Sequence, residues 1–323
     1  MRTLAIRVAL AALALAVVGA AAYAAAWYSA ANGLRTNIAG ALATHGGTLG
    51  SVAISGFPGT IELTADTARL PLPGVDGWQL VARDLRVRSP FTGGDPTFTV
   101  GGATLTFRGG SVTADAEPPA VGIWKANAVS LAARNVSLRW HDDAVWKVAR
   151  LRTDIIPGAG TGAIPDGTRL ILAAEGLSVP SLRRGPFGDT ADTLNVGAQL
   201  QQGALKSFDE AGVKAWRDGG GRVSAGVQVR WGTLDAETTG FYRLDTDGRP
   251  VGTTRALVGR ILEVVDALLA ARWIDAAARD DLVKAANFAM PADGGRVVVP
   301  LDLKDGGAWY ATTRVVDLPV LLP

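Results

Sequence analysis

The sequence predicts a mainly β protein of the α+β class. We expect an N-terminal transmembrane helix followed by an elongated, curved antiparallel β meander with a helical pair near the C-terminus. The helix is predicted by a run without charge, Val8 to Leu34. The meander is predicted by short segments that alternate apolar and polar residues between Gly, Pro and Asp turns. Because expected strands outnumber helices, we do not expect a doubly wound α/β fold.

Composition narrows the classes of function. The chain has 323 residues, of which 48% are apolar and 19% charged, so it is not a disordered chain. With 32 basic and 30 acidic residues and no dense Lys/Arg block, no nucleic-acid partner is expected. The chain has no cysteine, and its two histidines, His45 and His141, are far apart in sequence. We therefore predict no disulfide, metal or cofactor.

The uncharged run has the length and flanks of a membrane anchor. About 20 apolar residues in helical form cross a bilayer core. Arg2 and Arg7 precede the run, and Trp27 and Tyr28 close it, where interfacial aromatic residues are enriched. We expect residues 8–31 to cross the inner membrane once, with the N-terminus in the cytoplasm and the bulk of the protein in the periplasm.

The alternative is a signal peptide cleaved after Ala24, because Ala22-Tyr23-Ala24 offers a small-x-small site. An apolar run longer than a signal-peptide core favours the anchor. Beyond it the helical spacing continues to Leu42 and ends at Gly46-Gly47, a usual helix terminator. We therefore assign residues 1–46 to the anchor and exit helix, and residues 47–323 to a periplasmic β-rich domain.

Strands follow in sequence order. The expected strands are 51–54, 60–64, 78–82, 85–88, 98–100, 104–107, 129–131, 136–140, 145–148, 170–173, 194–200, 223–231, 234–244, 296–303 and 309–315. Residues 108–122 are expected to be loose. The connection Gly232-Thr233 predicts a tight hairpin between the two strands with the clearest alternation.

Helical spacing interrupts the strands in three places. Leu205, Phe208 and Trp216 share one face of an expected helix, which marks a possible subdivision of the domain near 205–220. Residues 254–271 and 275–289 are expected to form an αα-hairpin before the last strands. This helical pair has the right place in the chain to cover one end of the sheet.

Candidate site residues are few. Tryptophans Trp78, Trp140, Trp146, Trp231 and Trp309 lie in expected strands, where they fill a core or line a groove for acyl chains or glycans. His141-Asp142-Asp143 has the chemistry of a metal or acid–base site, but a turn explains these residues better. Gly158 to Gly162 lacks the ending of a phosphate loop, and Ser224 lies inside an expected strand and not at a nucleophile elbow. We predict no catalytic residue and no enzymatic activity.

Several segments in order carry a family resemblance. They are the anchor ending near Trp27, the turn Ser55-Gly56-Phe57-Pro58, the stretch Leu244 to Gly252 that contains Asp245 and Gly248-Arg249-Pro250, and a closing strand, Val297 to Leu303. On these residues the chain resembles the DUF2125 family. The resemblance implies a single-anchor periplasmic protein of Gram-negative bacteria and no particular activity. The chain is more loosely similar to AsmA-type envelope proteins, which implies a lipid-handling groove.

Three hypotheses follow for function. In the first, an anchored periplasmic protein binds or conveys an apolar ligand such as lipid in a β-sheet groove. In the second, a scaffold or assembly factor without enzymatic activity docks onto other envelope proteins through a sheet edge or helix. The third, a hydrolase, requires a convergent cleft of ionisable residues that the sequence does not display.

Overall fold

A computed structural model gives the arrangement of most of the chain. It describes residues 2–44, 46–71, 77–107, 110–125, 128–140, 145–160, 162–179, 185–207, 209–289, 296–310 and 313–317. The helices are α1 (Arg2–Thr44), α2 (Glu210–Asp218), α3 (Ile261–Ala270) and α4 (Ala276–Ala289). The first strands are β1 (Thr48–Leu49), β2 (Val52–Ser55), β3 (Thr60–Pro71), β4 (Gln79–Pro90), β5 (Thr97–Phe107), β6 (Gly110–Lys125), β7 (Ala128–Trp140) and β8 (Val145–Ile156). The others are β9 (Arg169–Ser178), β10 (Thr190–Gln201), β11 (Arg222–Trp231), β12 (Leu234–Leu244), β13 (Pro250–Gly259), β14 (Val297–Lys304), β15 (Gly307–Tyr310) and β16 (Thr313–Asp317).

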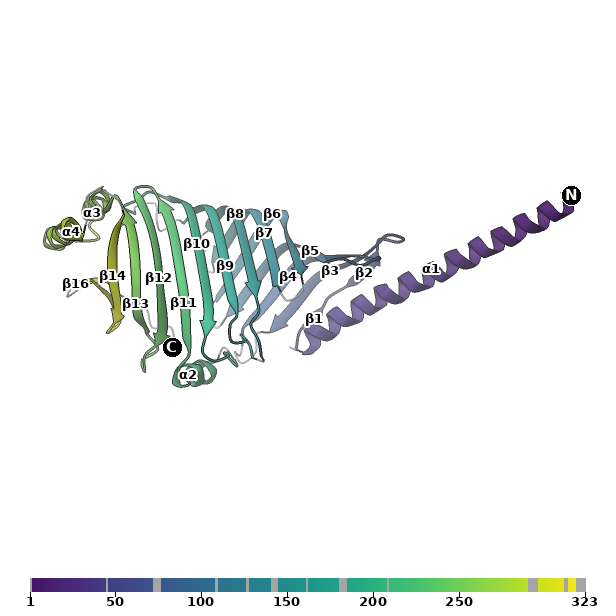
Figure 1. The fold of residues 1–323 in the computed structure, drawn as a ribbon, viewed down its shortest axis with the longest axis horizontal. Helices are drawn as coiled ribbons and strands as arrows, with labels where there is room; N and C mark the ends of the chain where they lie inside the picture. Colours follow the sequence, from purple (N-terminus) through teal and green to yellow (C-terminus); the bar gives the residue numbers. More distant parts are fainter. Residues whose placement is uncertain are drawn as a thin grey trace.

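Within the described residues the strands form one 16-stranded sheet. From β3 to β16 each strand pairs antiparallel with the next in sequence, and β1 and β2 both pair with β3. The order does not close on itself, so the sheet is open. Figure 1 shows a curved, elongated body with α1 projecting from the β3 end and α3 and α4 at the other. The predicted antiparallel meander, its N-terminal helix and its C-terminal helical pair are confirmed.

Helix α1 contains the expected anchor and exit helix in one uninterrupted element. It ends where predicted, because the N–H of Gly46 donates to the carbonyl of Ala43 at 2.9 Å and that of Gly47 donates to Leu42 at 2.8 Å. Gly46 has φ +72°, which favours glycine at this position. In the described part of the chain, no helix combines the length and the apolar character needed to cross a bilayer.

Several expected strand boundaries are wrong because irregularities inside strands look like turns in sequence. The strands expected at 78–82 and 85–88 are one strand, β4, which begins at Gln79 and in which Asp84 takes a φ of 52°. The stretch 108–122, expected to be loose, is largely β6. Pro118 lies where the register between β6 and β7 shifts, so the ladder does not require its missing N–H.

Two helix predictions need correction. Residues 254–259 belong to β13 and not to a helix, and α3 begins only at Ile261. The position of Leu257 is compatible with the apolar side of a helix and also with a strand. Residues 254–258 form a strand because they pair with both β12 and β14. The helix expected from Leu205 begins at Glu210, and Leu205 instead bridges Ile164. Residues 309–315 are divided between β15 and β16.

The start of α2 supplies a test of pH dependence. The Asp209 carboxylate accepts hydrogen bonds from Ser207 Oγ at 2.6 Å and from the N–H of Gly212 at 2.7 Å, which lower the pKa of Asp209. A lowered carboxyl pKa stabilises the fold above the ordinary carboxyl pKa and loses this effect as the pH falls through the folded pKa. We expect amide protection in α2 to fall in that acid range, and Asp209→Ala to lower it already at neutral pH. Hydrogen exchange measures this effect. A protection factor of the Gly212 amide that changes neither in acid nor in Asp209→Ala would contradict the assignment.

Candidate functional site

Antiparallel pairing gives the sheet two chemically distinct faces. Residues directly opposite each other in neighbouring strands point to the same face. One row of such pairs takes one residue from each strand from β3 to β14 and contains no charge. Its members are Leu63, Val87, Phe98, Gly122, Leu131, Thr153, Leu172, Val196, Val227, Thr238, Ala256 and Val299. We call this side the uncharged face.

The opposite side carries the ion pairs. There Arg150 Nε lies 2.6 Å from Glu175 Oε2, and Arg152 Nε lies 3.4 Å from Asp154 Oδ2. The row next to the uncharged one contains Thr64, Arg86, Thr99, Val121, Ala132, Arg152, Ala173, Asn195, Gln228, Glu237, Leu257 and Val298. We call this side the charged face. Such a division is the pattern expected when one side of a sheet is kept from water.

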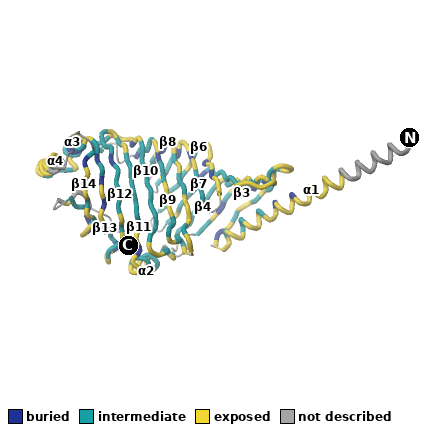
Figure 2. Tube along the Cα trace, in the orientation of Figure 1, coloured by how far each residue is buried: buried dark blue, intermediate teal, exposed yellow. Residues whose placement is uncertain are grey.

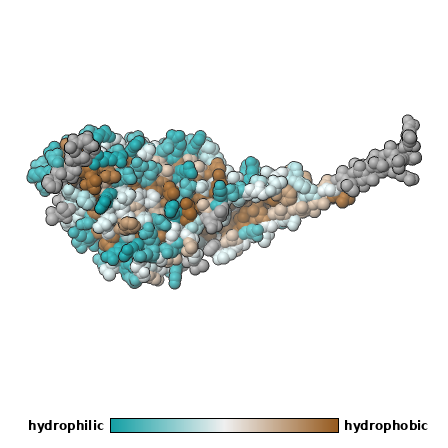
Figure 3. Space-filling view, in the orientation of Figure 1, coloured by the Kyte–Doolittle hydropathy of each residue, from teal (hydrophilic) through white to brown (hydrophobic). Residues whose placement is uncertain are grey.

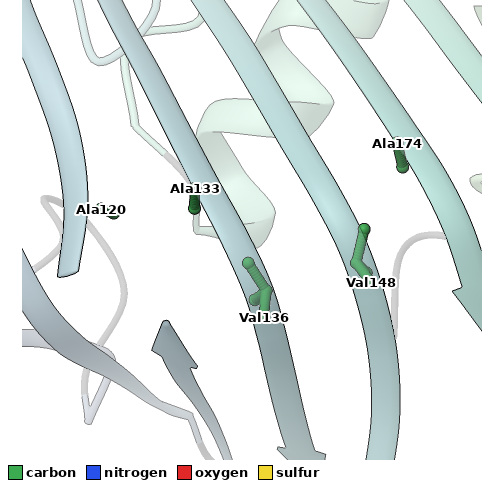
Figure 4. Close-up of a cluster of buried hydrophobic side chains, with 5 residues drawn as sticks. All are labelled: Ala120, Ala133, Val136, Val148 and Ala174. Carbon is green, nitrogen blue, oxygen red and sulfur yellow. The ribbon is translucent and has the colours of Figure 1, made fainter. Parts of the chain in front are cut away.

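The buried apolar side chains of the middle strands lie on the uncharged face. On that face Ala133 and Ala174 are buried, whereas their neighbours on the charged face, Ala132 and Ala173, are exposed and half-buried. Ala133 and Ala174 belong to a cluster drawn entirely from strands β6 to β9, and the half-buried side chains packed on it also come from β6 to β10 (Figure 4). Neighbouring strands alone supply this cover, so the apolar side chains of the middle strands are buried on the uncharged face.

Helices cover the two ends of the uncharged face. At the β3 end, Trp27 and Ala31 of α1 pack on Ile61 and are 2% and 1% exposed. At the other end, Val264 of α3 packs on Ala236 and Val258, beside the buried positions of the last strands (Figure 2). Among the described elements, no helix packs on the middle strands to a comparable extent. We call the uncharged face between the two helices the trough.

Large apolar side chains remain accessible inside the trough. Trp124, Ile155 and Leu170 belong to a second cross-strand row of the uncharged face, beside Val129. Their exposed fractions are 56%, 41% and 38%. Exposed apolar side chains also occur on the charged face, among them Ile171 and Phe241, but those of the trough lie beside a row that contains no charge. Exposed apolar surface is typical of a binding or interaction site.

Four of the five predicted tryptophans lie along one long margin of the trough, at the strand ends opposite the β2–β3 turn. The Trp140 and Trp146 rings contact each other at 5.1 Å between centroids with a tilt of 52°, Trp78 contacts the Phe107 ring at 5.4 Å and Trp231 contacts the Phe187 ring at 5.2 Å. Leu138 packs on the Ala133 cluster, pairs with Trp146 and lies two residues before Trp140, which places both tryptophans on the uncharged face. Trp231 pairs with Leu234 and alternates with Val227 of the uncharged row.

Trp309 differs from the other four. It pairs with Asp302, which lies on the charged face, and its ring is 6.0 Å from Lys304 Nζ and 5.9 Å from the Arg314 guanidinium carbon. The Trp309 indole N–H donates to the carbonyl of Lys304 at 3.0 Å. Its surroundings are therefore cationic, unlike those of an acyl-chain groove.

The sequence did not reveal a second aromatic group at the β3 end, which we call the collar: Tyr23, Trp27, Phe57 and Phe91. The Tyr23 ring lies 6.0 Å from Phe57 and 5.3 Å from Phe91, and Trp27 lies 5.5 Å from Phe57. The collar joins α1 to the β2–β3 and β4–β5 turns. Trp27 and Phe57 both fall in the segments that carry the family resemblance, but sequence gives no sign that they touch.

The charged face has a hollow of its own, of about 770 Å³, across β9 to β14. Gly197 and Gly226 leave its floor open, and Phe241, which is 60% exposed, stands at its side. Arg169 and Arg255 also line it. An acyl chain placed there would lie against charged groups, so we regard the trough as the better site for an apolar ligand.

The polar candidates do not converge. His45 and the His141-Asp142-Asp143 cluster lie outside the described residues. Among the residues that are described, no group of three or more His, Cys, Asp or Glu has the arrangement of a metal site. Ser224 lies in β11, where its hydroxyl accepts a hydrogen bond from Gln201 Nε2 at 3.1 Å. The N–H of Gly158, in the glycine-rich stretch, donates to Thr168 Oγ1 at 3.0 Å.

The protein is of the class that has one open antiparallel β-sheet with one uncharged face and a long N-terminal helix. The sequence profile of the family described as "Uncharacterized protein conserved in bacteria (DUF2125)" matches residues 27–319. The chain therefore belongs to the DUF2125 family, as its residues predicted. No curated protein and no solved structure matches the chain.

Proposed function

We propose that this protein is anchored in the inner membrane and binds or conveys a lipid in its periplasmic trough. The observation that carries the proposal is the unbroken uncharged row from Leu63 to Val299 along one face of an open sheet. Strands lie about 4.8 Å apart, so the eight steps from β4 to β12 extend roughly 38 Å. One bilayer leaflet has only about 15 Å of hydrocarbon, half of a core of about 30 Å. The trough is therefore long enough for a complete acyl chain.

Physical chemistry favours an apolar ligand over a polar one. Accessible apolar surface gains about 25 cal/mol for each Å² removed from water. Trp124, Ile155 and Leu170 offer such surface. The uncharged row beside them presents no charge to a ligand. We expect mass spectrometry of organic extracts to find lipid in the purified full chain. Lipid-free protein, purified without delipidating detergent, would contradict the proposal.

The anchoring part of the proposal is tested by a topology reporter. Val8 to Leu34 carries no charge, and Arg2 and Arg7 precede it, which supports a cytoplasmic N-terminus. An alkaline phosphatase fused after Pro323 should be active, because this enzyme requires export, and a green fluorescent protein at the same place should be dark. Deletion of residues 8–31 should reverse both readings. An active phosphatase in soluble periplasm would indicate cleavage after Ala24, and a bright fluorescent fusion would overturn the location.

The open sheet edges favour a second candidate, a scaffold for other envelope proteins. Within the described residues the strand order ends at β16 on one side and at β1 and β2 on the other. An edge strand presents backbone groups that pair with a strand of another chain. Crosslinking from residues of β2 to one protein, together with protein purified free of lipid, would favour the scaffold.

A further inference from the structure

The collar and the turns around it lie at the end of the sheet from which α1 projects (Figure 1). Figure 1 shows the β2–β3 hairpin extending along α1 toward the N-terminus, and Figure 3 shows hydrophobic surface where this end of the sheet meets α1. Phe57 is 50% exposed, Tyr23 40% and Tyr28 60%. Three large aromatic side chains thus remain open to the surroundings at the base of the proposed anchor.

The length of α1 sets the depth of this hairpin. Between Arg7 and Tyr23 lie residues 8–22, which are 15 residues (22 − 8 + 1) and extend about 22 Å as a helix. A bilayer core of about 30 Å is longer than this segment. Extending the helix to Tyr28 adds six residues (28 − 22) and reaches about 31 Å. If the core begins after Arg7, its outer boundary falls near Tyr28, and the hairpin contacts Tyr23 on the hydrocarbon side of that boundary.

The backbone of the hairpin turn is suited to a place with little water. Unsatisfied carbonyl groups cost several kcal/mol in lipid. Tyr23 Oη donates to the carbonyl of Pro58 at 2.7 Å, and Trp27 Nε1 donates to that of Thr60 at 3.0 Å. Gly56 O accepts from the N–H of Thr60 at 3.0 Å. At the end of β4, the N–H of Phe91 donates to the carbonyl of Gly59 at 3.2 Å.

We infer that the collar is inserted in the outer leaflet of a phospholipid bilayer and is the place where an acyl chain passes from the leaflet into the trough. This inference rests on the anchoring proposed above and names the entry point of the same site. Phe91 follows β4 on the uncharged face, in the same alternation as Val87, which pairs with Phe98 of the uncharged row. An acyl chain beside Phe91 therefore meets the first open strands of the trough, next to the part that α1 covers.

Depth-dependent quenching tests the insertion, and the absence of native cysteine makes single labels simple. The full chain would carry one cysteine at a time, labelled with an environment-sensitive fluorophore, in phosphatidylcholine nanodiscs. Phe57→Cys and Thr92→Cys place labels at the two turns beside the collar. Trp273→Cys is the matched control, since Trp273 is 57% exposed at the opposite end of the body, between α3 and α4.

We expect nitroxide near the top of the acyl chains to quench the labels at 57 and 92 more than nitroxide on the headgroup does. The label at 273 should respond to neither. Labels at both turns that behave like the label at 273, in protein that remains in the nanodisc, would overturn the collar and leave the anchor intact. Protein that leaves the nanodisc altogether would instead overturn the anchoring, and the collar with it.

Entry is tested separately from insertion by a charge in the collar. Phe57→Asp should lower the rate of transfer of a fluorescent phospholipid between donor liposomes and the full chain, while Trp273→Asp should not. Lipid already bound in the trough should persist in Phe57→Asp, because that residue lies outside the uncharged row. Equal transfer rates for both variants would show that lipid enters elsewhere and would leave the binding function standing.

Discussion

Val196→Asp is expected to reduce the amount of lipid that co-purifies with the full chain by at least about tenfold. Val196 lies in the middle of the uncharged row, between Leu172 of β9 and Val227 of β11. A carboxylate there would have to lose its water against an acyl chain, and an unpaired charge in apolar surroundings costs several kcal/mol. Tenfold corresponds to only about 1.4 kcal/mol, so the expected loss is conservative.

The adjacent residue provides a matched control. Asn195 precedes Val196 in β10, points to the charged face and is exposed. Asn195→Asp introduces the same charge with almost the same shape, and its cross-strand partners Ala173 and Gln228 carry no charge. This variant should retain lipid. Val196→Asp protein that shows native circular dichroism and a normal lipid content would remove the trough as the binding site.

A second variant at the same position shows whether the effect of Val196→Asp comes from the charge or from loss of folding. Val196→Thr changes the shape of the side chain little and leaves a neutral group that can hydrogen-bond. It should fold and retain most of the lipid, because two threonines, Thr153 and Thr238, already lie in the same row. A charge-specific loss, present in Val196→Asp and absent in Val196→Thr, is what an uncharged ligand requires.

Alternation alone was enough to predict the strands with one clear buried side. Val223 to Trp231 and Leu234 to Leu244 form β11 and β12, with Trp231 opposite Leu234 across the expected hairpin. Apolar–polar alternation did not predict the strand where the backbone is irregular but stays in the sheet. Pro118 in β6 is such a place, because proline usually breaks a ladder and here lies at a register shift.

The site was harder to predict than the fold because a face is a property of paired strands. Trp231 and Trp309 both lie in strands, yet one pairs with Leu234 on the uncharged face and the other with Asp302 on the charged face. Sequence spacing within a strand does not contain this register. The collar depends on contact between residues more than thirty positions apart, such as Trp27 and Thr60, with a separation of 33.

Trp27→Ala is expected to separate α1 from the sheet, with a loss of about 3–5 kcal/mol in the stability of that contact. The Trp27 side chain is 2% exposed, its ring packs edge-on at 5.5 Å from Phe57, and its indole N–H donates to Thr60. Hydrogen exchange in detergent would measure the effect locally. The amides of β2 and β3 should lose protection, while those of β11 and β12 should keep it.

Neighbouring substitutions separate packing from hydrogen bonding at this joint. Trp27→Phe retains an aromatic ring and loses the bond to the Thr60 carbonyl, for which we expect about 1 kcal/mol. Tyr28→Ala removes an exposed ring one residue away and should cost less than Trp27→Ala. Equal loss of protection in Trp27→Ala and Tyr28→Ala would contradict a specific joint at Trp27. Helix α1 covers the β3 end of the trough through the packing of Trp27 on Ile61, so the proposed function predicts that this joint is needed for lipid uptake. A variant that loosens it should therefore bind lipid in solution and fail to take lipid from a bilayer, which places the defect at the connection and not in the trough.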